Sequence, residues 1–397
     1  MPTETSTRPR GTLRRRPSRR ATPAPPVPVE DDTGWVMLAA IVAMLCTIGL
    51  MMVLSASSVE ALRSYGGAWV FFQKQLMWVA IGSVVLMAAA LADYHLWRRA
   101  VLPLLGGSFV LLVLVLVPGV GISAGGSSRW LGTESLRVQP SELAKLGILL
   151  FGADLLSRRA DLVGDWRSVM KPLLITTGLV AGLVLVQPDM GTTLLMVFIV
   201  FVLMFVGGVR LAPMAGLSVL ASAGSVFLAK VEGYRWERVA SFRDPFNDVQ
   251  GSGYQVAQSL VALGTGHVGG VGLGASRAKW GFLPNAHTDF IFAIVGEELG
   301  LIGTFGVVAL FVGFAVVGIR TALRAPDRFG SLLAAGVTAW VCGQAVVNMG
   351  AVTSLLPVTG VPLPFVSFGG SSLVVTMAAT GILLNVARQA KRAPSAA

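Results

Sequence analysis

The stretch WVMLAAIVAMLCTIGLMMVL, residues 35–54, decides the fold, because it contains no charged side chain over its whole length. A helix of about 20 apolar residues is long enough to span the hydrocarbon core of a bilayer. The rest of the chain has the same character: of 397 residues, 54% are hydrophobic and 13% are charged, and the mean hydropathy is +0.73. These values lie outside the range of soluble globular domains and predict a polytopic membrane protein.

The apolar runs of the chain predict about ten transmembrane helices. We expect them near residues 35–54, 70–92, 100–117, 141–157, 172–187, 190–207, 211–229, 290–319, 330–356 and 366–387. Lys145 and Asp154 interrupt the fourth run, so we expect that span to face protein or a wet cavity. The predicted fold is an all-α polytopic membrane protein with one large extracytoplasmic loop, about residues 230–288, between the seventh and eighth helices.

The basic residues predict the orientation, because Lys and Arg of short loops are retained on the cytoplasmic side. With the N-terminus inside, the short outer loops contain only Arg63, Arg129 and Arg137. The predicted cytoplasmic loops and C-terminal tail contain Arg98, Arg99, Arg158, Arg159, Arg167, Lys171, Arg210, Arg320, Arg324, Arg328, Arg388, Lys391 and Arg392. Both termini are therefore expected in the cytoplasm, and the net charge of +11 reflects this asymmetry and attraction to anionic lipid rather than nucleic acid.

Composition divides the chain into three parts. Residues 1–34 are rich in Arg and Pro and predict a disordered cytoplasmic tail, residues 35–389 form the transmembrane domain, and residues 390–397 form a short cytoplasmic tail. The first apolar run has full spanning length, so we expect an anchor that stays rather than a cleaved signal peptide. Cys46 and Cys342 both lie in predicted spans, which indicates neither a disulfide framework nor a thiolate metal site.

The large loop is rich in aromatic residues and predicts local structure. An amphipathic helix is expected over residues 253–263, and the Gly-rich stretch GTGHVGGVGLG, residues 264–274, is interpreted as tight turns. The stretch does not fit a phosphate-binding loop, because it lacks a preceding strand and the Gly-Lys-Ser/Thr sequence. The loop is also expected outside the cell, where ATP is scarce. Group transfer at this outer face would therefore need a substrate that arrives already activated.

The segment FLPNAHTDFIFAIVGEELG, residues 282–300, contains carboxylates at the mouth of an apolar helix and inside it. Charged residues at membrane depth are costly and mark candidate functional sites. Asp289 opens the eighth span, where a carboxylate suits general base catalysis. The alternative is that Thr288 or Asp289 caps the helix, and position alone favours capping.

Glu297 and Glu298 lie about 12–14 Å along the same helix from Asp289, at a rise of about 1.5 Å per residue. Two neighbouring ionised carboxylates would repel each other, so we expect one of them to be protonated or paired with a cation. Lys145 is the expected buried partner. A structural ion pair between two helices is favoured over a proton relay.

Glu142 and Lys145 are three residues apart on one helix face and can pair with each other. Alternatively, they can combine with Arg129 and Arg137 to clamp a phosphate-bearing ligand, because guanidinium groups match phosphate oxygens in a bidentate geometry. Further cations of the large loop that would add to this field are Arg235, Arg238, Arg243 and Lys279.

Two Pro-containing breaks and three dispersed histidines complete the set of polar candidates. QPDMG, residues 187–191, and LPVTG, residues 356–360, are interpreted as turns that line an outer cavity. His95, His267 and His287 accompany no HExxH sequence, so no zinc site is predicted.

Seven segments of this chain resemble the SEDS family of bacterial membrane proteins (shape, elongation, division and sporulation), over about residues 35–389. They are SRWL (128–131), LRVQPSELAK (136–145), QPDMGTT (187–193), SFRDPF (241–246), GYQVAQSLVALGTG (253–266), LPNAHTDFIFAIVGEELG (283–300) and LPVTGVPLPFVSFGGSS (356–372). Asn285-Ala286 stands where the elongation branch usually has Glu-Arg, so the resemblance favours the division branch. The sporulation paralogue stays open.

The resemblance implies a glycosyltransferase that polymerises lipid II, a lipid-diphosphate-linked disaccharide-pentapeptide, into peptidoglycan at the outer face of the cytoplasmic membrane. Asp289 matches the family's essential acidic residue and would deprotonate the acceptor hydroxyl, which places the base interpretation above capping. The implied substrate-binding residues are Arg129, Arg137, Glu142, Lys145, Lys279 and His287. The residues expected to shape the cavity are Gln187, Asp189, Glu297, Glu298, Ser367 and Ser371.

The resemblance also implies partners and a location. A class B penicillin-binding protein and other divisome membrane proteins are expected at the division septum. A divalent cation, Mg²⁺ or Mn²⁺, is an open expectation at the diphosphate, although the sequence contains no dedicated set of ligands. The alternatives are a lipid II flippase and a noncatalytic divisome scaffold, and the flippase ranks last because the polar residues gather on the outer side.

Overall fold

The structure is a computed structural model that describes residues 33–124, 127–133, 137–231, 244–247, 251 and 253–390. The predicted N-terminal tail up to residue 32, residues 391–397 and part of the large outer loop lie outside the described residues. The predicted loop cations Arg235, Arg238 and Arg243 also lie outside them. The fold below is that of the unit that begins at Thr33.

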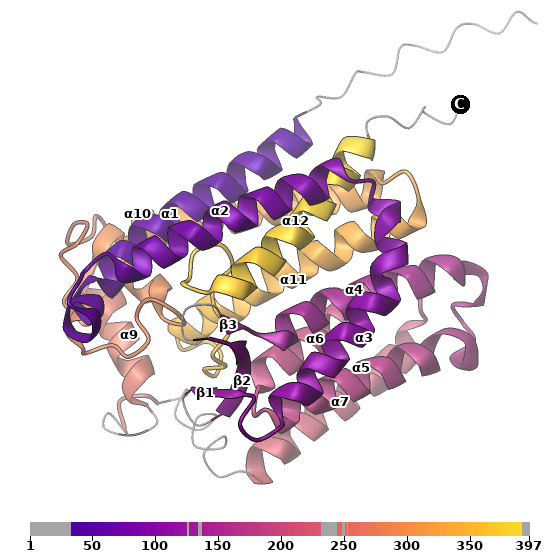
Figure 1. Ribbon diagram of the computed structural model, residues 1–397, viewed down its shortest axis with the longest axis horizontal. Coiled ribbons are helices and arrows are strands. Elements are labelled where there is room, and N and C mark those ends of the chain that lie inside the picture. The colour runs from indigo at the N-terminus through magenta and orange to yellow at the C-terminus, as the bar shows by residue number, and fades with distance from the viewer. Residues whose placement is uncertain are drawn as a thin grey trace, which may run out of the picture. The chain divides into compact units, whose positions relative to one another are not determined.

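Long helices make up most of the described chain (Figure 1). In chain order they are α1 (Gly34–Tyr65), α2 (Val70–Leu91), α3 (Trp97–Val115), α4 (Pro140–Arg158), α5 (Lys171–Val186), α6 (Met190–Val206), α7 (Leu211–Val231), α10 (Ile291–Arg324), α11 (Arg328–Val352) and α12 (Gly370–Ala390). The shorter elements are α9 (Tyr254–Thr265) and the single turns η1 (Tyr94–Leu96), η2 (Ala160–Leu162), η3 (Trp166–Met170) and η4 (Ala278–Trp280).

Each predicted span overlaps one of these long helices, so the helical membrane fold is confirmed. Among the described residues, seven helices are long and apolar enough to cross a bilayer by length and composition. The apolar helices of α6 and the first part of α7 are shorter, and α4 contains Glu142, Lys145, Asp154 and Arg158. The number of membrane crossings therefore stays a prediction.

Helix α1 continues to Tyr65, well beyond the predicted end at residue 54. Hydropathy detects only the part of a helix that lies in hydrocarbon, whereas this extension is stabilised by contacts with other segments. Glu60 lies 3.3 Å from Nδ1 of His287, and Arg63 donates to the carbonyl oxygen of Trp280. The helix expected over residues 253–263 is confirmed as α9.

A small antiparallel sheet between α3 and α4 was not predicted. Its strands β1 (Ile122–Ala124), β2 (Ser127–Gly132) and β3 (Arg137–Val138) pair in the order β1-β2-β3, with Gly132 opposite Arg137. The strands are too short for a clear alternation of polar and apolar residues, which is why the sequence did not reveal them. The sheet positions Arg129 and Arg137 on neighbouring strands.

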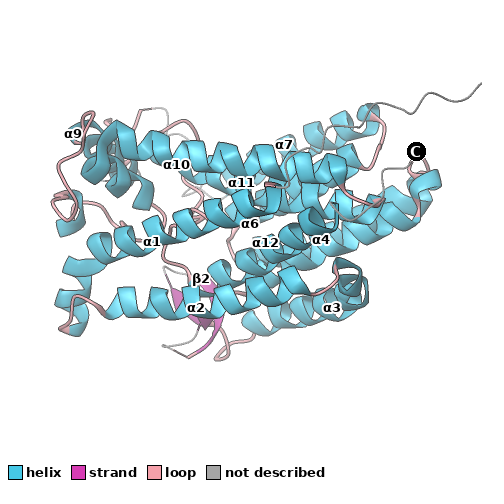
Figure 2. Cartoon of the chain, turned by 90° about the horizontal axis from the view of Figure 1, so that it is seen from above, coloured by secondary structure: helices cyan, strands magenta, loops and turns pink. Residues whose placement is uncertain are grey.

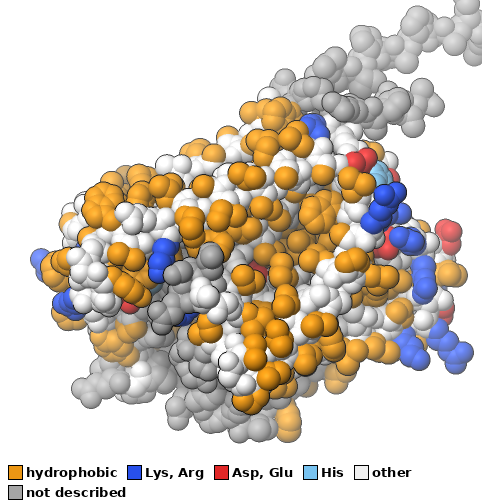
Figure 3. Space-filling view, in the orientation of Figure 1, with side chains coloured by type: hydrophobic (Ala, Val, Ile, Leu, Met, Phe, Trp, Pro, Cys, Tyr) orange, Lys and Arg blue, Asp and Glu red, His pale blue; other side chains and the backbone are white. Residues whose placement is uncertain are grey.

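The helices pack into a bundle in which α11, α12 and α4 are the most buried (Figures 1 and 2). Helix α2 lies along α12, and α10 packs against α1 and α11. Few residues of α2 are fully buried, whereas α12 is buried along most of its length. Hydrophobic side chains cover the middle of the face seen in Figure 3, as expected for a surface in contact with lipid.

Charged side chains gather where the helices connect, which defines two ends of the bundle (Figure 3). We call the end with the α2–α3, α4–α5, α6–α7 and α10–α11 connections the inner end. There His95 bridges Asp93 and Asp327, at 2.7 and 3.0 Å, and Tyr94 donates to Asp327 at 2.8 Å. The outer end holds the opposite connections and almost all of the predicted site residues.

Candidate functional site

Helix α10 is interrupted at Gly300, where the backbone leaves the helical region with φ 65° and ψ −160°. A side chain at Gly300 would collide with the backbone of Val268 and Gly270, so only glycine fits there. The N–H groups of Val271 and Gly272 bond the carbonyls of Glu297 and Glu298 at 2.9 and 3.1 Å. The glycine-rich loop thus supplies hydrogen bonds that the broken helix lacks, and its predicted turns are confirmed by positive φ angles at Gly270, Gly272 and Gly274.

The two buried glutamates of α10 bind the loop that crosses this interruption. The Glu297 carboxylate accepts from the N–H groups of Arg277 and Ala278, at 2.9 and 3.3 Å, and from the Ser276 hydroxyl. The Glu298 carboxylate accepts from the N–H of Ser276 at 3.2 Å and from the Ser55 hydroxyl of α1. Both glutamates therefore anchor residues 274–280 onto α10.

The expectation that Lys145 pairs with these glutamates is wrong. The cation beside Glu298 is Lys279, whose Nζ lies 3.5 Å from Oε1 and also donates to the carbonyl of Gly274 at 2.6 Å. Lys279 belongs to the loop, and its sequence distance from Glu298 gave no sign of the contact. Its side chain is almost fully buried, a position that favours a structural ion pair, while its substrate-binding role stays a prediction.

Lys145 instead pairs with Glu142 on the same helix, the other arrangement considered from the sequence. Its Nζ lies 2.9 Å from Glu142 Oε2, donates to Gln344 Oε1 at 3.1 Å, and sits 4.9 Å from the centre of the Trp340 ring. Lys145 and Glu142 are 1% and 2% exposed, so this is a buried charge pair. Its lysine faces α11, from which both Gln344 and Trp340 project.

Asp289 lies in a turn just before α10, where its side chain is partly exposed. The helix begins at Ile291 with Phe290 at the N-cap, so Asp289 lies one residue outside the capping position. The Asn348 amide holds its backbone by donating to the Asp289 carbonyl at 2.8 Å. The carboxylate faces Gly360, where a Cβ would stand 3.7 Å from Oδ2 in ordinary van der Waals contact, and where a φ of +71° favours glycine.

Residues 357–369, which connect α11 to α12, hold the Asp289 turn from the other side. The Ser367 hydroxyl donates to the Thr288 carbonyl at 2.6 Å and accepts from the N–H of Leu363 at 2.8 Å. The N–H of Phe368 donates to the carbonyl of His287 at 3.0 Å. The predicted cavity residue Ser367 therefore fixes the turn that presents Asp289.

His287 is 7% exposed and lies in an aromatic environment. Its ring centre is 4.8 Å from that of Phe71 and 5.7 Å from that of Phe368, and Nδ1 lies 3.3 Å from Glu60 Oε2. These contacts join α1, α2 and the α11–α12 connection next to Asp289. The predicted substrate-binding role of His287 stays a prediction.

Arg129 and the QPDMG break form one contact region. The guanidinium group donates from Nε to the carbonyl of Gln187 at 2.9 Å and from a terminal nitrogen to the carbonyl of Pro188. The Gln187 amide donates to the carbonyl of Leu112 at 3.0 Å. Asp189 caps α6 by accepting from the N–H of Thr192 at 3.1 Å. Arg129 therefore holds the QPDMG break against β2, and the predicted cavity role of Gln187 and Asp189 stays a prediction.

Gln139, two residues after Arg137, connects this contact region to Ser371. Gln139 donates from its side chain to Asp189 at 3.2 Å and from its backbone to the Ser371 hydroxyl at 3.1 Å, which connects β3 to α12. The buried Nε of Arg137 has no hydrogen-bond partner among the described residues. Of the two predicted arginines, Arg129 is engaged with backbone carbonyls, whereas Arg137 has a donor left to bind a ligand.

Two polar residues of α11 that were not predicted connect these parts. Gln344 donates to the carbonyl of Pro362 at 2.9 Å, and Asn348, one turn later, donates to the carbonyl of Val361 at 2.9 Å as well as to Asp289. Both are almost fully buried. Their spacing of four residues within an apolar span was the available signal, because polar side chains on one face of a membrane helix point to a buried partner.

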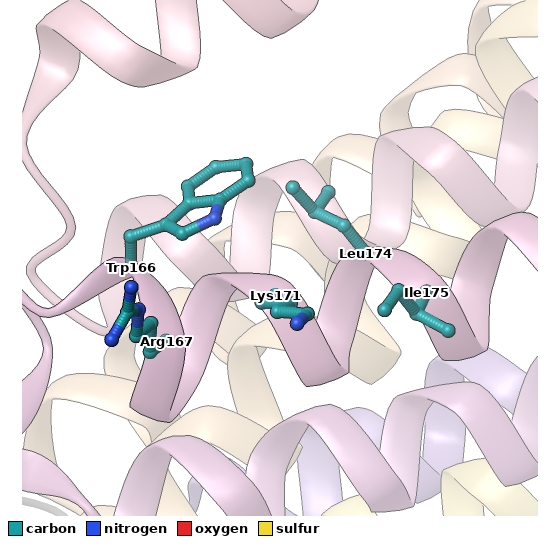
Figure 4. A pocket seen from close by; sticks show the side chains of 5 residues that line it. All are labelled: Trp166, Arg167, Lys171, Leu174 and Ile175. Carbon is teal, nitrogen blue, oxygen red and sulfur yellow. The ribbon is translucent and has the colours of Figure 1, made fainter.

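Two hollows lie among the described residues, and neither is lined by a predicted site residue. An apolar groove of about 650 Å³ runs between α9, α10 and α11, beside the interruption at Gly300, and is lined by residues that include Leu263, Phe292 and Met349. A second hollow, of about 350 Å³, lies at the inner end, where Trp166, Arg167 and Lys171 project from η3 and the start of α5 (Figure 4).

Comparison with known proteins shows a family match over almost the whole chain. Residues 36–392 match the FtsW/RodA/SpoVE family, described as cell cycle protein. The probable peptidoglycan glycosyltransferase FtsW of Geobacter sp. (strain M18) is 38% identical, over 91% of this chain and 98% of that protein. Stage V sporulation protein E of Bacillus subtilis (strain 168) is 41% identical, over 90% of this chain and 97% of that protein.

A solved structure supports the same relationship. It is a chain from a study of how a peptidoglycan synthase complex coordinates polymerization and crosslinking. It matches with a TM-score of 0.72 and 30% sequence identity, over 92% of this chain and 99% of that chain. The shared fold therefore extends over almost the whole described unit.

Proposed function

The chain belongs to the FtsW/RodA/SpoVE family of cell cycle proteins, and from this membership we propose that it is a peptidoglycan glycosyltransferase that polymerises lipid II. The observation that carries the proposal is the Asp289 turn. A partly exposed carboxylate stands at the outer end, held by Asn348 and Ser367, on a hydrogen-bonded network that reaches the buried cation Lys145. A base beside cationic groups suits transfer of a sugar from a diphosphate leaving group.

In the proposed step, Asp289 removes the proton of the acceptor sugar's 4-hydroxyl. The oxygen attacks the anomeric carbon of the donor, the bond from that carbon to the lipid diphosphate breaks, and the configuration inverts. The diphosphate leaves with the bonding electron pair, so cations near it stabilise the transition state. Arg137 is the leading candidate because its buried Nε has no hydrogen-bond partner among the described residues, whereas Glu142 already compensates the charge of Lys145.

A divalent cation at the diphosphate is also part of the expectation from the sequence. The described residues contain no group of three or more His, Cys, Asp or Glu side chains that could hold one. The described residues therefore do not fit a resident metal ion, and the proposed step does not involve one. Dependence of strand synthesis on Mg²⁺ or Mn²⁺ would indicate a cation that binds together with the substrate.

We further propose a penicillin-binding protein as partner, because the matching structure belongs to a peptidoglycan synthase complex. The proposed location is the division septum, with other divisome membrane proteins nearby and both termini in the cytoplasm. The basic residues at the inner end support this orientation. A sporulation role is the related alternative, since a stage V sporulation protein is among the relatives.

The test is strand synthesis from purified lipid II by the protein reconstituted with its penicillin-binding partner. Asp289→Asn should lower the rate by at least about 100-fold, the usual contribution of a general base. Asp161→Asn, at an exposed inner-end carboxylate, is the matched control and should keep wild-type activity. Equal rates for Asp289→Asn and wild type would remove the base assignment.

The same preparation tests the alternative functions. A flippase would move lipid II across the liposome membrane without forming strands. A scaffold would bind the partner and do neither. Absence of strands from the wild-type complex, with a partner whose transpeptidase domain is active, would reject the polymerase proposal.

A further inference from the structure

Helix α11 carries a row of buried residues that connects the two charged parts of the proposed site. Trp340, Gln344 and Asn348 follow one another at intervals of four residues, so their side chains lie on one face of the helix. Their exposed fractions are 0%, 0% and 2%. Burial of an amide side chain is unfavourable unless it is hydrogen-bonded. The hydrogen-bond partners of Gln344 and Asn348 therefore show which groups these two side chains hold in place.

The orientation of the Gln344 amide is fixed by two donors. Its Oε1 accepts from Trp340 Nε1 at 2.9 Å and from Lys145 Nζ at 3.1 Å. Because the oxygen must face both donors, the NH₂ group faces the opposite way, toward the carbonyl of Pro362 at 2.9 Å. The position of Lys145 is thereby connected to the backbone of the α11–α12 connection.

Asn348 continues the connection to Asp289. Its NH₂ group donates to the carbonyl of Val361 at 2.9 Å and to the carbonyl of Asp289 at 2.8 Å, which uses both of its hydrogens. The carbonyls of Val361 and Pro362 are consecutive, so Asn348 and Gln344 bind one short piece of backbone. Proline at 362 and 364 restricts the φ angles of that piece, which limits its movement.

We propose that Asn348 and Gln344 are positioning residues that keep Asp289 and Lys145 at a fixed separation. This inference rests on the proposed function of Asp289 as the base. Neither amide touches the reacting atoms. Asn348 acts by holding the backbone of Asp289, and Gln344 acts by holding the Lys145 side chain. Loss of the Asn348 amide should therefore lower the rate of the chemical step without weakening substrate binding.

Asn385 offers a matched control at the other end of the bundle. It is also fully buried on a neighbouring helix, α12, where it accepts from the N–H of Tyr94 at 3.0 Å and donates to the carbonyl of Ala90 at 2.8 Å. Replacing either asparagine by leucine removes a buried amide of similar size and leaves backbone groups without a partner. A purely structural role therefore predicts similar consequences for Asn348→Leu and Asn385→Leu.

The experiment measures kcat and KM for lipid II polymerisation by wild type, Asn348→Leu and Asn385→Leu, each in complex with the penicillin-binding partner, below their unfolding temperatures. Asn348→Leu should lower kcat by about 10- to 100-fold, the effect of misplacing a reacting group by about 1 Å, with KM changed less than about twofold. Asn385→Leu should lower the unfolding temperature comparably and leave kcat unchanged.

A milder variant keeps the test decisive if Asn348→Leu does not fold. Asn348→Ser retains one donor and should give a kcat between those of wild type and the general-base variant Asp289→Asn. Wild-type kcat for Asn348→Ser and Asn348→Leu, or equal losses from Asn348→Leu and Asn385→Leu, would overturn the positioning role. An inactive wild-type complex would instead reject the proposed function, and the inference with it.

Discussion

The two buried lysine–glutamate pairs of the outer end have the same chemistry and different surroundings. Lys279 and Glu298 come from a loop and a helix, and further donors reach the carboxylate from Ser276 and Ser55. Lys145 and Glu142 come from one helix, and the Lys145 ammonium also donates to the Gln344 amide of α11. The first pair closes a loop onto a helix, whereas the second joins α4 to α11.

The hydrogen-bond partners of a buried charged side chain therefore indicate whether it is structural or functional better than its burial does. Glu298 holds residues 274–280 through Oε1, so a substrate that took over this oxygen would detach the loop. The Glu142–Lys145 pair contacts a side chain of α11 instead, so it can exchange a partner without detaching a loop. We therefore interpret Lys279–Glu298 as a structural anchor and Glu142–Lys145 as part of the proposed site.

The largest effect is expected on the stability of the protein, when the Lys279–Glu298 pair is broken. Glu298→Leu leaves the buried Lys279 ammonium without its counter-charge, which should destabilise the protein by about 3–5 kcal/mol. The measurement is thermal unfolding in detergent. The double variant Lys279→Met, Glu298→Leu removes both charges and should recover most of the loss. A single variant as stable as wild type would show that the pair anchors nothing.

An intermediate effect is expected for the neighbouring arginines of the sheet. Arg137→Gln should lower strand synthesis by about 100-fold, the cost of losing one donor that stabilises developing charge, with little change in unfolding temperature. Arg129→Gln is the matched control, and it should mainly lower stability, because Arg129 bonds the carbonyls of Gln187 and Pro188. The reverse pattern would exchange the roles assigned to the two arginines.

The smallest effect is expected at the inner end, where carboxylates are exposed. The N–H of His95 donates to Asp93 and lowers the pKa of that carboxyl below its usual value. A lowered folded-state pKa contributes stability above the unfolded pKa, and this contribution is lost as the pH falls through the folded pKa. Asp93→Asn should therefore lower the unfolding temperature slightly at neutral pH and not in acid. An equal loss at both pH values would contradict the pairing.

The sequence predicted the parts of the fold that hydropathy controls. Each apolar run became a helix, and the segment 253–263 became α9 because its apolar residues recur at helical spacing. The sheet of residues 122–138 and the extension of α1 to Tyr65 depend on contacts between distant segments, which local patterns do not encode. Hydropathy therefore predicted the membrane spans and missed the structure beyond them.

The same division applies to the candidate site. Asp289 was found as a carboxylate at a helix mouth, and the motif resemblance gave it a role. The partner of Glu298 was missed because Lys145, a cation inside a predicted span, was favoured as the buried partner, and only the folded loop brings Lys279 close. Gln344 and Asn348 were missed because a neutral amide costs less to bury in an apolar span than a charge does, so it is a weaker sign of a functional site.

The interruption of α10 at Gly300 also has a mechanical consequence. A continuous helix behaves as a rod that carries a tilt or twist from one end to the other, whereas α10 is two rods joined at a glycine joint. We expect a tilt of residues 301–324 in the membrane to be taken up at that joint, where the helical hydrogen bonds are interrupted. Asp289, at the start of the short outer rod, would then keep its alignment with the loops around it while the longer rod adjusts to the bilayer.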